Sequence, residues 1–306
     1  MEIVPIPENE MAGAIAVNAF AILSTLALFC IFLRVLWMGV LRLLGENIAQ
    51  SLFNTQLGYY AACLLIANMI NGIAGLMGLP FLVNHAITDN ALCTSQATVM
   101  QIGNIATAYF TVAIAIHTFN SLVLRKRQSI CVYGPTIIIG WLTSLAVAFV
   151  PLLPQMGPLY GPSALACGVR PTFPWHLFFF HLLPIFVGAV ISAVLYTLIF
   201  LVLHGTITIK GLSPEDHRSD RSGSPYQRFV ASIARSMLWY PAAYILLLVP
   251  YAVTRSVGIG GTVIPFQVVV FAFVCWFTLG VVNALLLFNT FRVLTPAFEA
   301  KSINGP

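Results

Sequence analysis

The chain has 306 residues, of which 59% are hydrophobic and only 8% are charged, and its formal net charge is +5. Soluble domains carry about a quarter charged residues, so this composition excludes a soluble globular protein. It also excludes an intrinsically disordered chain, because so much apolar surface would not remain exposed to water. We therefore expect an integral membrane protein.

Seven apolar stretches follow one another along the chain, each close to the roughly 20 residues that a helix needs to span a bilayer. Their ranges are 15–33, 57–83, 93–124, 134–153, 175–203, 237–253 and 263–288. None contains Asp, Glu, Lys or Arg, so the predicted fold is an all-α bundle of seven transmembrane helices. In the second stretch Gly72, Gly75 and Gly78 recur every three residues, a pattern that favours close helix packing.

The basic residues predict the orientation of this bundle. Of the 14 Lys and Arg residues, all except Arg170 and Arg255 fall on one side of the predicted membrane. Since Lys and Arg accumulate in cytosolic loops, segment 1–14 is predicted to be extracellular and segment 292–306 to be a short cytosolic tail. Segment 1–14 also lacks the basic flank of a cleaved signal peptide. Loop 204–227 has the composition of a flexible cytosolic linker, and the expected location is the plasma membrane.

Two of the six cysteines, Cys93 and Cys167, fall on the predicted outer side. Disulfides form in oxidising compartments, and these are the only two cysteines expected to face one. The sequence therefore predicts a Cys93–Cys167 disulfide, which would tie the second outer loop to the third helix.

Uncharged polar residues within the spans are expected to face the interior of the bundle, because contact with lipid would be costly. They are Asn18, Asn68, Asn71, Gln96, Gln101, Asn104, His181 and Asn283. Some of them are candidates to bind a ligand that enters from outside, although interhelical hydrogen bonds explain them equally well. Together with outer-loop residues, the ligand-binding candidates are Gln101, Asn104, Trp175, His181, Arg170 and Arg255. An anionic ligand would use one of the two arginines.

The sequence contains no recognisable catalytic constellation. No carboxylate lies within a span, which disfavours a proton-coupled transporter. The seventh stretch has no Lys, so a retinal Schiff base cannot form there. His117 lies near the predicted inner end, whereas His176 and His181 lie near the outer end, so these three cannot bind one metal ion. We therefore expect neither enzyme activity, nor a cofactor, nor a metal site.

Two basic sites lie on the predicted cytosolic face. One is the cluster Arg125, Lys126 and Arg127 after the third helix, and the other comprises Arg228 and Arg235 on a predicted helical extension before the sixth. Both are explained by anchoring to anionic headgroups. Both equally suit the docking of an acidic or amphipathic protein segment, and nucleic acid is not an expected partner.

Seven helices, an external amino terminus and a disulfide from the third helix to the second outer loop resemble the G-protein-coupled receptors. The chain departs from the rhodopsin-like pattern. Its third helix ends in a stretch from His117 to Arg125 instead of an acidic-Arg-Tyr triplet, and residues 283–292 lack the Asn-Pro pair and Tyr.

Other stretches are similar to the fungal receptors related to cyclic-AMP receptors and to glucose-sensing receptors. These stretches are His117-Thr-Phe-Asn120, Trp141, Leu238-Trp-Tyr-Pro241-Ala-Ala-Tyr244 and Pro250. The resemblance implies coupling to a heterotrimeric G protein through the inner ends of helices three, five and six. The coupling candidates are His117, Asn120, Arg125, Lys126, Arg127, Arg228 and Arg235. Pro241 and Pro250 remove backbone donors from the sixth helix and are the candidate hinge.

The expected function is therefore that of a cell-surface receptor. It would bind an extracellular small molecule or peptide and activate a G protein through movement of the sixth helix. The alternative is a facilitator or channel for a small uncharged solute, which the amide-lined interior would also suit. An intramembrane enzyme is a third possibility, and the missing acid, base or metal ligands count against it.

Overall fold

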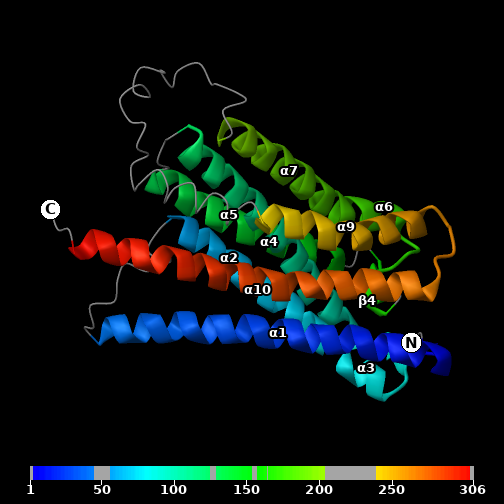
Figure 1. The fold of residues 1–306 in the computed structure, drawn as a ribbon. Coiled ribbons are helices and arrows are strands. Elements are labelled where there is room, and N and C mark those ends of the chain that lie inside the picture. The colour runs from blue at the N-terminus through cyan, green and yellow to red at the C-terminus, as the bar shows by residue number, and fades with distance from the viewer. Residues whose placement is uncertain are drawn as a thin grey trace.

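The computed structural model describes residues 3–44, 56–124, 129–153, 157–163, 165–203 and 239–303. Within these ranges seven helices are long and apolar enough to cross a membrane. They form an elongated bundle in which the first helix begins at one end and the last helix finishes at the other (Figure 1). The predicted seven-helix fold is confirmed, whereas the side of the membrane that each end faces remains a prediction.

The helices extend beyond the apolar stretches that predicted them. The first three spanning helices are α1 (Glu8–Leu43), α2 (Gln56–Leu76) with the short α3 (Leu79–Val83) after it, and α4 (Ala91–Leu122). The other four are α5 (Ile130–Phe149) with η2 (Val150–Leu152), α7 (Leu183–Leu203) preceded by α6 (Pro174–His176) and η4 (Leu177–Leu182), α9 (Trp239–Ile259) and α10 (Phe266–Ile303). Helix α1 thus begins inside the segment 1–14, where Glu8 and Glu10 favour the positive end of the helix dipole. Helix α10 continues into the segment 292–306.

Helix α4 is the central element of the bundle. It packs against α2, α5 and α7, whereas α1 packs against α2 and α10, and α9 packs between α7 and α10. Polar residues of α4 such as Gln101, Asn104 and Thr111 are all buried. Rim helices instead leave large apolar side chains such as Leu142 and Leu246 exposed, as lipid-facing surfaces require.

The polar residues within the spans mostly face the interior, as predicted. The buried ones are Asn68, Asn71, Gln96, Gln101, Asn104, His181 and Asn283. Asn18 is half-buried and donates to the carbonyl oxygen of Ala14 at 2.9 Å. Most of these side chains bind a neighbouring helix or their own backbone, which is how polar groups are tolerated within a membrane.

Glycines on α2 allow three helices to approach one another. A Cβ atom added at Gly75 would lie 2.7 Å from the Cβ of Ala21 in α1 and 2.6 Å from the ring of Phe277 in α10. A Cβ atom at Gly72 would meet the side chain of Thr25 in α1. The packing role that the sequence predicted for these two glycines is confirmed.

Two short antiparallel strand pairs cover one end of the bundle, which we call the strand end. Strand β1 (Ile3–Pro5) pairs with β2 (Ala86–Thr88), and β3 (Tyr160–Ser163) pairs with β4 (Ala166–Val169). The opposite end, where α10 finishes, is called the tail end (Figure 1).

The strand end is held to the helices by a disulfide and a buried amide. Cys93 at the start of α4 is bonded to Cys167 in β4, which confirms the predicted disulfide. One turn further along α4, the Gln96 Oε1 atom accepts the Cys167 N–H at 2.9 Å. The Gln96 Nε2 atom donates to the carbonyl of Ala74 in α2 at 2.9 Å. The Gln96 side chain thus connects α2, α4 and β4.

Candidate functional site

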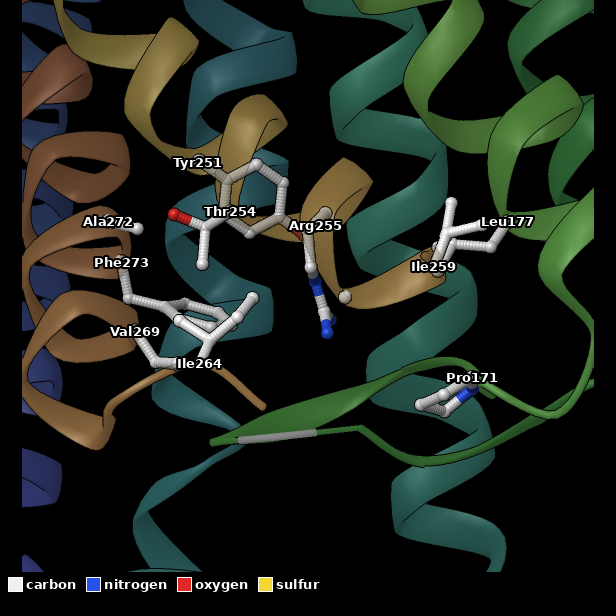
Figure 2. Close-up of a pocket in the computed structure, with 11 residues that line it drawn as sticks. Pro171, Leu177, Tyr251, Thr254, Arg255, Ile259, Ile264, Val269, Ala272 and Phe273 are labelled. Carbon is white, nitrogen blue, oxygen red and sulfur yellow. The ribbon is translucent and has the colours of Figure 1, made fainter. Parts of the chain in front are cut away.

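A pocket of about 140 Å³ lies at the strand end, between α9, α10 and the segment that follows β4 (Figure 2). Most of its walls are apolar, and they include Pro171, Leu177, Ile259, Ile264 and Phe273. A half-enclosed apolar cavity with a few polar groups is typical of a small-molecule binding site. The polar groups in this pocket come from α9.

Arg255 is the charged side chain among the residues that line this pocket. It is half-buried and extends from α9 into the pocket (Figure 2). Its guanidinium carbon lies 5.7 Å and 5.8 Å from the ring centroids of Tyr251 and Phe273. Its Nε atom lies 3.5 Å from the Tyr251 hydroxyl oxygen. No carboxylate of the described residues forms a salt bridge with Arg255.

A chain of buried hydrogen bonds leads from the pocket into the core. The Tyr251 hydroxyl lies 2.9 Å from His181 Nε2, and His181 Nδ1 lies 2.8 Å from Gln101 Oε1. Gln101 Nε2 then donates to the backbone carbonyl of Phe180. Because His181 and Gln101 are only 3% and 2% exposed, water cannot compete for these bonds. The chain connects α9, η4 and α4.

The direction of each donor in this chain follows from its last member. The Phe180 carbonyl can only accept, so the Gln101 amide nitrogen must face it and the Gln101 oxygen must face His181. His181 Nδ1 therefore donates, and in a neutral imidazole Nε2 accepts from the Tyr251 hydroxyl. The Tyr251 oxygen then remains free to accept from Arg255 Nε. Every donor of the chain is satisfied in this arrangement.

A proline explains why the Phe180 carbonyl is available. Pro184 stands four residues after Phe180 and has no N–H, so it cannot supply the α-helical hydrogen bond to this carbonyl. The helix widens into the π-helical segment η4 immediately before Pro184, and the Gln101 amide reaches the carbonyl from α4. Pro184 was a sequence signal for this site that the analysis of the sequence did not use.

Tyr251 also joins α9 to α10 through its ring. The ring stacks on Trp276 with centroids 5.2 Å apart, and it meets Phe273 edge-on at 5.4 Å. Tyr251 was not among the predicted site residues. The available signals were its place directly after Pro250 and one helical turn before Arg255.

The structure brings three of the six predicted ligand-binding residues together. Arg255 lines the pocket, and His181 and Gln101 lie beneath it in the hydrogen-bond chain. Asn104 is buried one turn further along α4, and its Nδ2 atom has no hydrogen-bond partner among the described residues. It lies outside the pocket.

The other two candidates point elsewhere. The Arg170 guanidinium forms a 2.6 Å salt bridge with Asp89 and donates to the Tyr160 carbonyl at 3.0 Å, so it stabilises the strand end. The Trp175 side chain is 72% exposed and stacks on Phe179 on the outside of the bundle. Neither side chain lines the pocket.

Two of the predicted coupling residues fall within the described residues. His117 and Asn120 lie in the last two turns of α4 towards the tail end, and the His117 ring meets the edge of Tyr60 at 5.8 Å. The other candidates, together with the predicted linker 204–227, lie outside the described residues; these candidates are Arg125, Lys126, Arg127, Arg228 and Arg235. Of the predicted hinge residues, Pro250 lies inside α9 and Pro241 lies in its first turn. Within the described ranges, no group of three or more His, Cys, Asp or Glu side chains is placed to hold a metal ion.

No protein-family model matches the sequence, and no curated protein matches it. Among solved structures, the chain is similar to squid rhodopsin, with a TM-score of 0.66 over 96% of this chain and 87% of that one. The chain has the rhodopsin fold. Sequence identity to squid rhodopsin is 14%, so the likeness concerns the fold alone. The rhodopsin fold agrees with the bundle that the sequence predicted, and it leaves the finer resemblance to fungal receptors as a proposal.

Proposed function

We propose that this protein is a receptor that binds an extracellular ligand at the strand end and activates a heterotrimeric G protein at the tail end. The observation that carries the proposal is the pocket around Arg255, which is joined to the central helix α4 by the Tyr251–His181–Gln101 chain. A pocket at one end of a rhodopsin fold, with a buried polar connection into the core, suits a protein that transmits binding across a membrane.

The proposed orientation puts the strand end outside the cell. Arg170 and Arg255 are the only basic residues assigned to that side by the sequence, and the positive-inside rule favours this arrangement. The Cys93–Cys167 disulfide supports it, because disulfides persist in an oxidising compartment. The plasma membrane is the location that these features suit.

Helix α9 is the element proposed to move. Pro250 lies inside it and has no N–H, so the carbonyl of Leu246 lacks its α-helical donor and the helix can bend there. Tyr251 follows directly and holds α9 to η4 and α10. A ligand that binds Arg255 more tightly in one of two α9 packings would shift the population towards that packing by its differential affinity.

The first experiment reconstitutes the purified chain with a G-protein heterotrimer and measures guanine-nucleotide exchange. We expect exchange that falls when Arg125, Lys126 and Arg127 are together replaced by Gln, because the G protein would dock on this basic cluster. The matched control is Arg34→Gln, which removes a cation that lies over Phe288, 4.8 Å from the centroid of its ring.

Both variants are first checked for insertion and for thermal melting, so that a folding defect is recognised. A folded chain that promotes exchange with no heterotrimer would overturn the receptor proposal. Solute flux in proteoliposomes that is insensitive to guanine nucleotides would then establish the facilitator.

A further inference from the structure

We infer that the pocket around Arg255 binds a small monocarboxylate with an apolar body of about six carbons, whose carboxylate pairs with the Arg255 guanidinium. The inference names the ligand class of the proposed receptor and rests on that function only for the consequence of binding. Binding itself is a separate property, because it is measured without a G protein.

The charge of Arg255 is the first argument. A half-buried guanidinium among apolar walls has lost part of its hydration, and no carboxylate of the described residues compensates it. The other outer arginine, Arg170, is already paired with Asp89 at 2.6 Å. Arg255 is thus the cation at this end that is open to an anion from outside. A planar guanidinium binds a carboxylate through two parallel hydrogen bonds, which makes a carboxylate a good geometric match.

The other polar groups of the pocket are already used. The Thr254 hydroxyl donates to the Pro250 carbonyl at 2.7 Å. The Tyr251 hydroxyl donates to His181, as the direction of the hydrogen-bond chain requires. Arg255 therefore supplies the free donors, and the residues that line the pocket include no acid that would pair with an ammonium group. This pattern favours a ligand with one anionic group over a sugar, an amine or a free amino acid.

The size of the pocket sets the size of the apolar body. A cavity of roughly 150 Å³ lined by apolar side chains holds one benzene molecule. The pocket here is about 140 Å³, so it accommodates about six carbon atoms beside Leu177, Ile264 and Phe273. A peptide or a nucleotide is too large to be enclosed.

The test is a binding measurement on the full chain in nanodiscs of zwitterionic lipid, with empty nanodiscs as the blank because amphiphiles partition into lipid. Titration calorimetry compares hexanoate with hexanamide, hexylamine and acetate. We expect saturable binding of hexanoate, with hexanamide and acetate at least tenfold weaker and no binding of hexylamine. A charge-assisted hydrogen bond to arginine accounts for a difference of about ten- to a hundredfold.

Two variants locate the site. Arg255→Gln removes the cation, and we expect the affinity for hexanoate to fall about ten- to a hundredfold. Gly258→Leu keeps the cation and fills the pocket, and we expect it to abolish binding. A Cβ atom at Gly258 meets only Ile264 Cδ1 at 3.6 Å, which is an ordinary contact, so this variant is expected to fold. Gly258→Ala is the matched control and should retain binding.

Several results would overturn the inference. Equal binding of hexanoate and hexanamide would remove the role of the charge. Binding that survives Gly258→Leu, or that is lost with Arg170→Gln but not with Arg255→Gln, would remove this pocket. Displacement of hexanoate in nanodiscs that contain phosphatidylglycerol would make a lipid headgroup the occupant. A chain that binds hexanoate as expected but promotes no nucleotide exchange would keep the inference and overturn the receptor function, and the reverse result would do the opposite.

Discussion

Arg255 and Tyr251 stand one helical turn apart on α9, and their side chains have different tasks. Arg255 presents its charge to the pocket, whereas Tyr251 connects α9 to the interior through both its hydroxyl and its ring. The two tasks can be separated experimentally, because the Tyr251 hydroxyl can be removed without removing the ring.

Tyr251→Phe is expected to lower stability. The substitution retains the stack on Trp276 but leaves His181 Nε2 buried without a donor, at a cost of about 1–3 kcal/mol. The measurement is the thermal melting temperature in detergent. The matched control is Tyr59→Phe, because the Tyr59 ring is 44% exposed and stacks on Tyr133. A melting temperature equal to that of the unmodified chain would show that this hydrogen bond contributes nothing.

Gln101 and Tyr251 are expected to be energetically coupled through His181. In a double-mutant cycle, Gln101→Leu and Tyr251→Phe should lower stability by less together than the sum of their separate effects, because either one disrupts the same chain. The expected coupling energy is about 0.5–3 kcal/mol. Additive effects on melting would mean that the two bonds act independently.

At the scale of residues, the sequence predicted part of the site. It named Gln101, His181 and Arg255 because polar groups in spans and cations on the outer side are rare and therefore informative. It did not separate Arg255 from Arg170, because the Asp89 partner lies 81 residues away in the sequence. It placed Trp175 near the correct end but could not predict which way the side chain faces.

The next scale is that of the helices, where small residues decide how closely α1, α2 and α10 pack. Gly75→Ala is expected to destabilise the bundle by about 1–3 kcal/mol, since its Cβ would come too close to Ala21 and Phe277. The matched control is Gly39→Ala in α1, where nothing lies within 4 Å of an added Cβ. The control should be neutral or slightly stabilising, because Ala favours a helix more than Gly does. Equal melting of the two variants would contradict this packing argument.

The disulfide between α4 and β4 is expected to stabilise the strand end. Replacing Cys93 and Cys167 together by Ser removes a cross-link between residues 74 positions apart, which typically costs about 2–5 kcal/mol. A reducing agent should lower the melting temperature of the unmodified chain and leave that of the double variant unchanged. An effect of the reductant on the double variant would point to another target.

Element boundaries show where prediction from apolar stretches ends. Such stretches report the part of a helix that meets lipid, whereas helical hydrogen bonding continues in water, as α1 and α10 do at their ends. The seven spans were therefore predictable and their limits were not. The π-helical form of η4 depends on Pro184 together with a partner in α4, and that pairing is a tertiary property.

For the whole molecule, the orientation can be tested with one native and one introduced cysteine. Cys131 is exposed at the start of α5, and Val263, which is 93% exposed, lies between α9 and α10 at the strand end. A membrane-impermeant thiol reagent applied to intact cells should label the Val263→Cys variant and leave the parent chain unlabelled. Cys131 should react after permeabilisation. Labelling of the parent chain in intact cells would invert the predicted topology.

Helix α4 meets neighbours on nearly all sides, whereas rim helices such as α1 and α5 meet them on only part of their surface. A change in side-chain volume on α4 must be accommodated by several elements at once, because protein interiors are close-packed. The same change on the outward face of α5, at Leu142 for example, meets only lipid. Mutational tolerance should therefore be uneven: in a saturation mutagenesis screen for surface expression, α4 should accept few substitutions at any position, and α5 should accept many on one face.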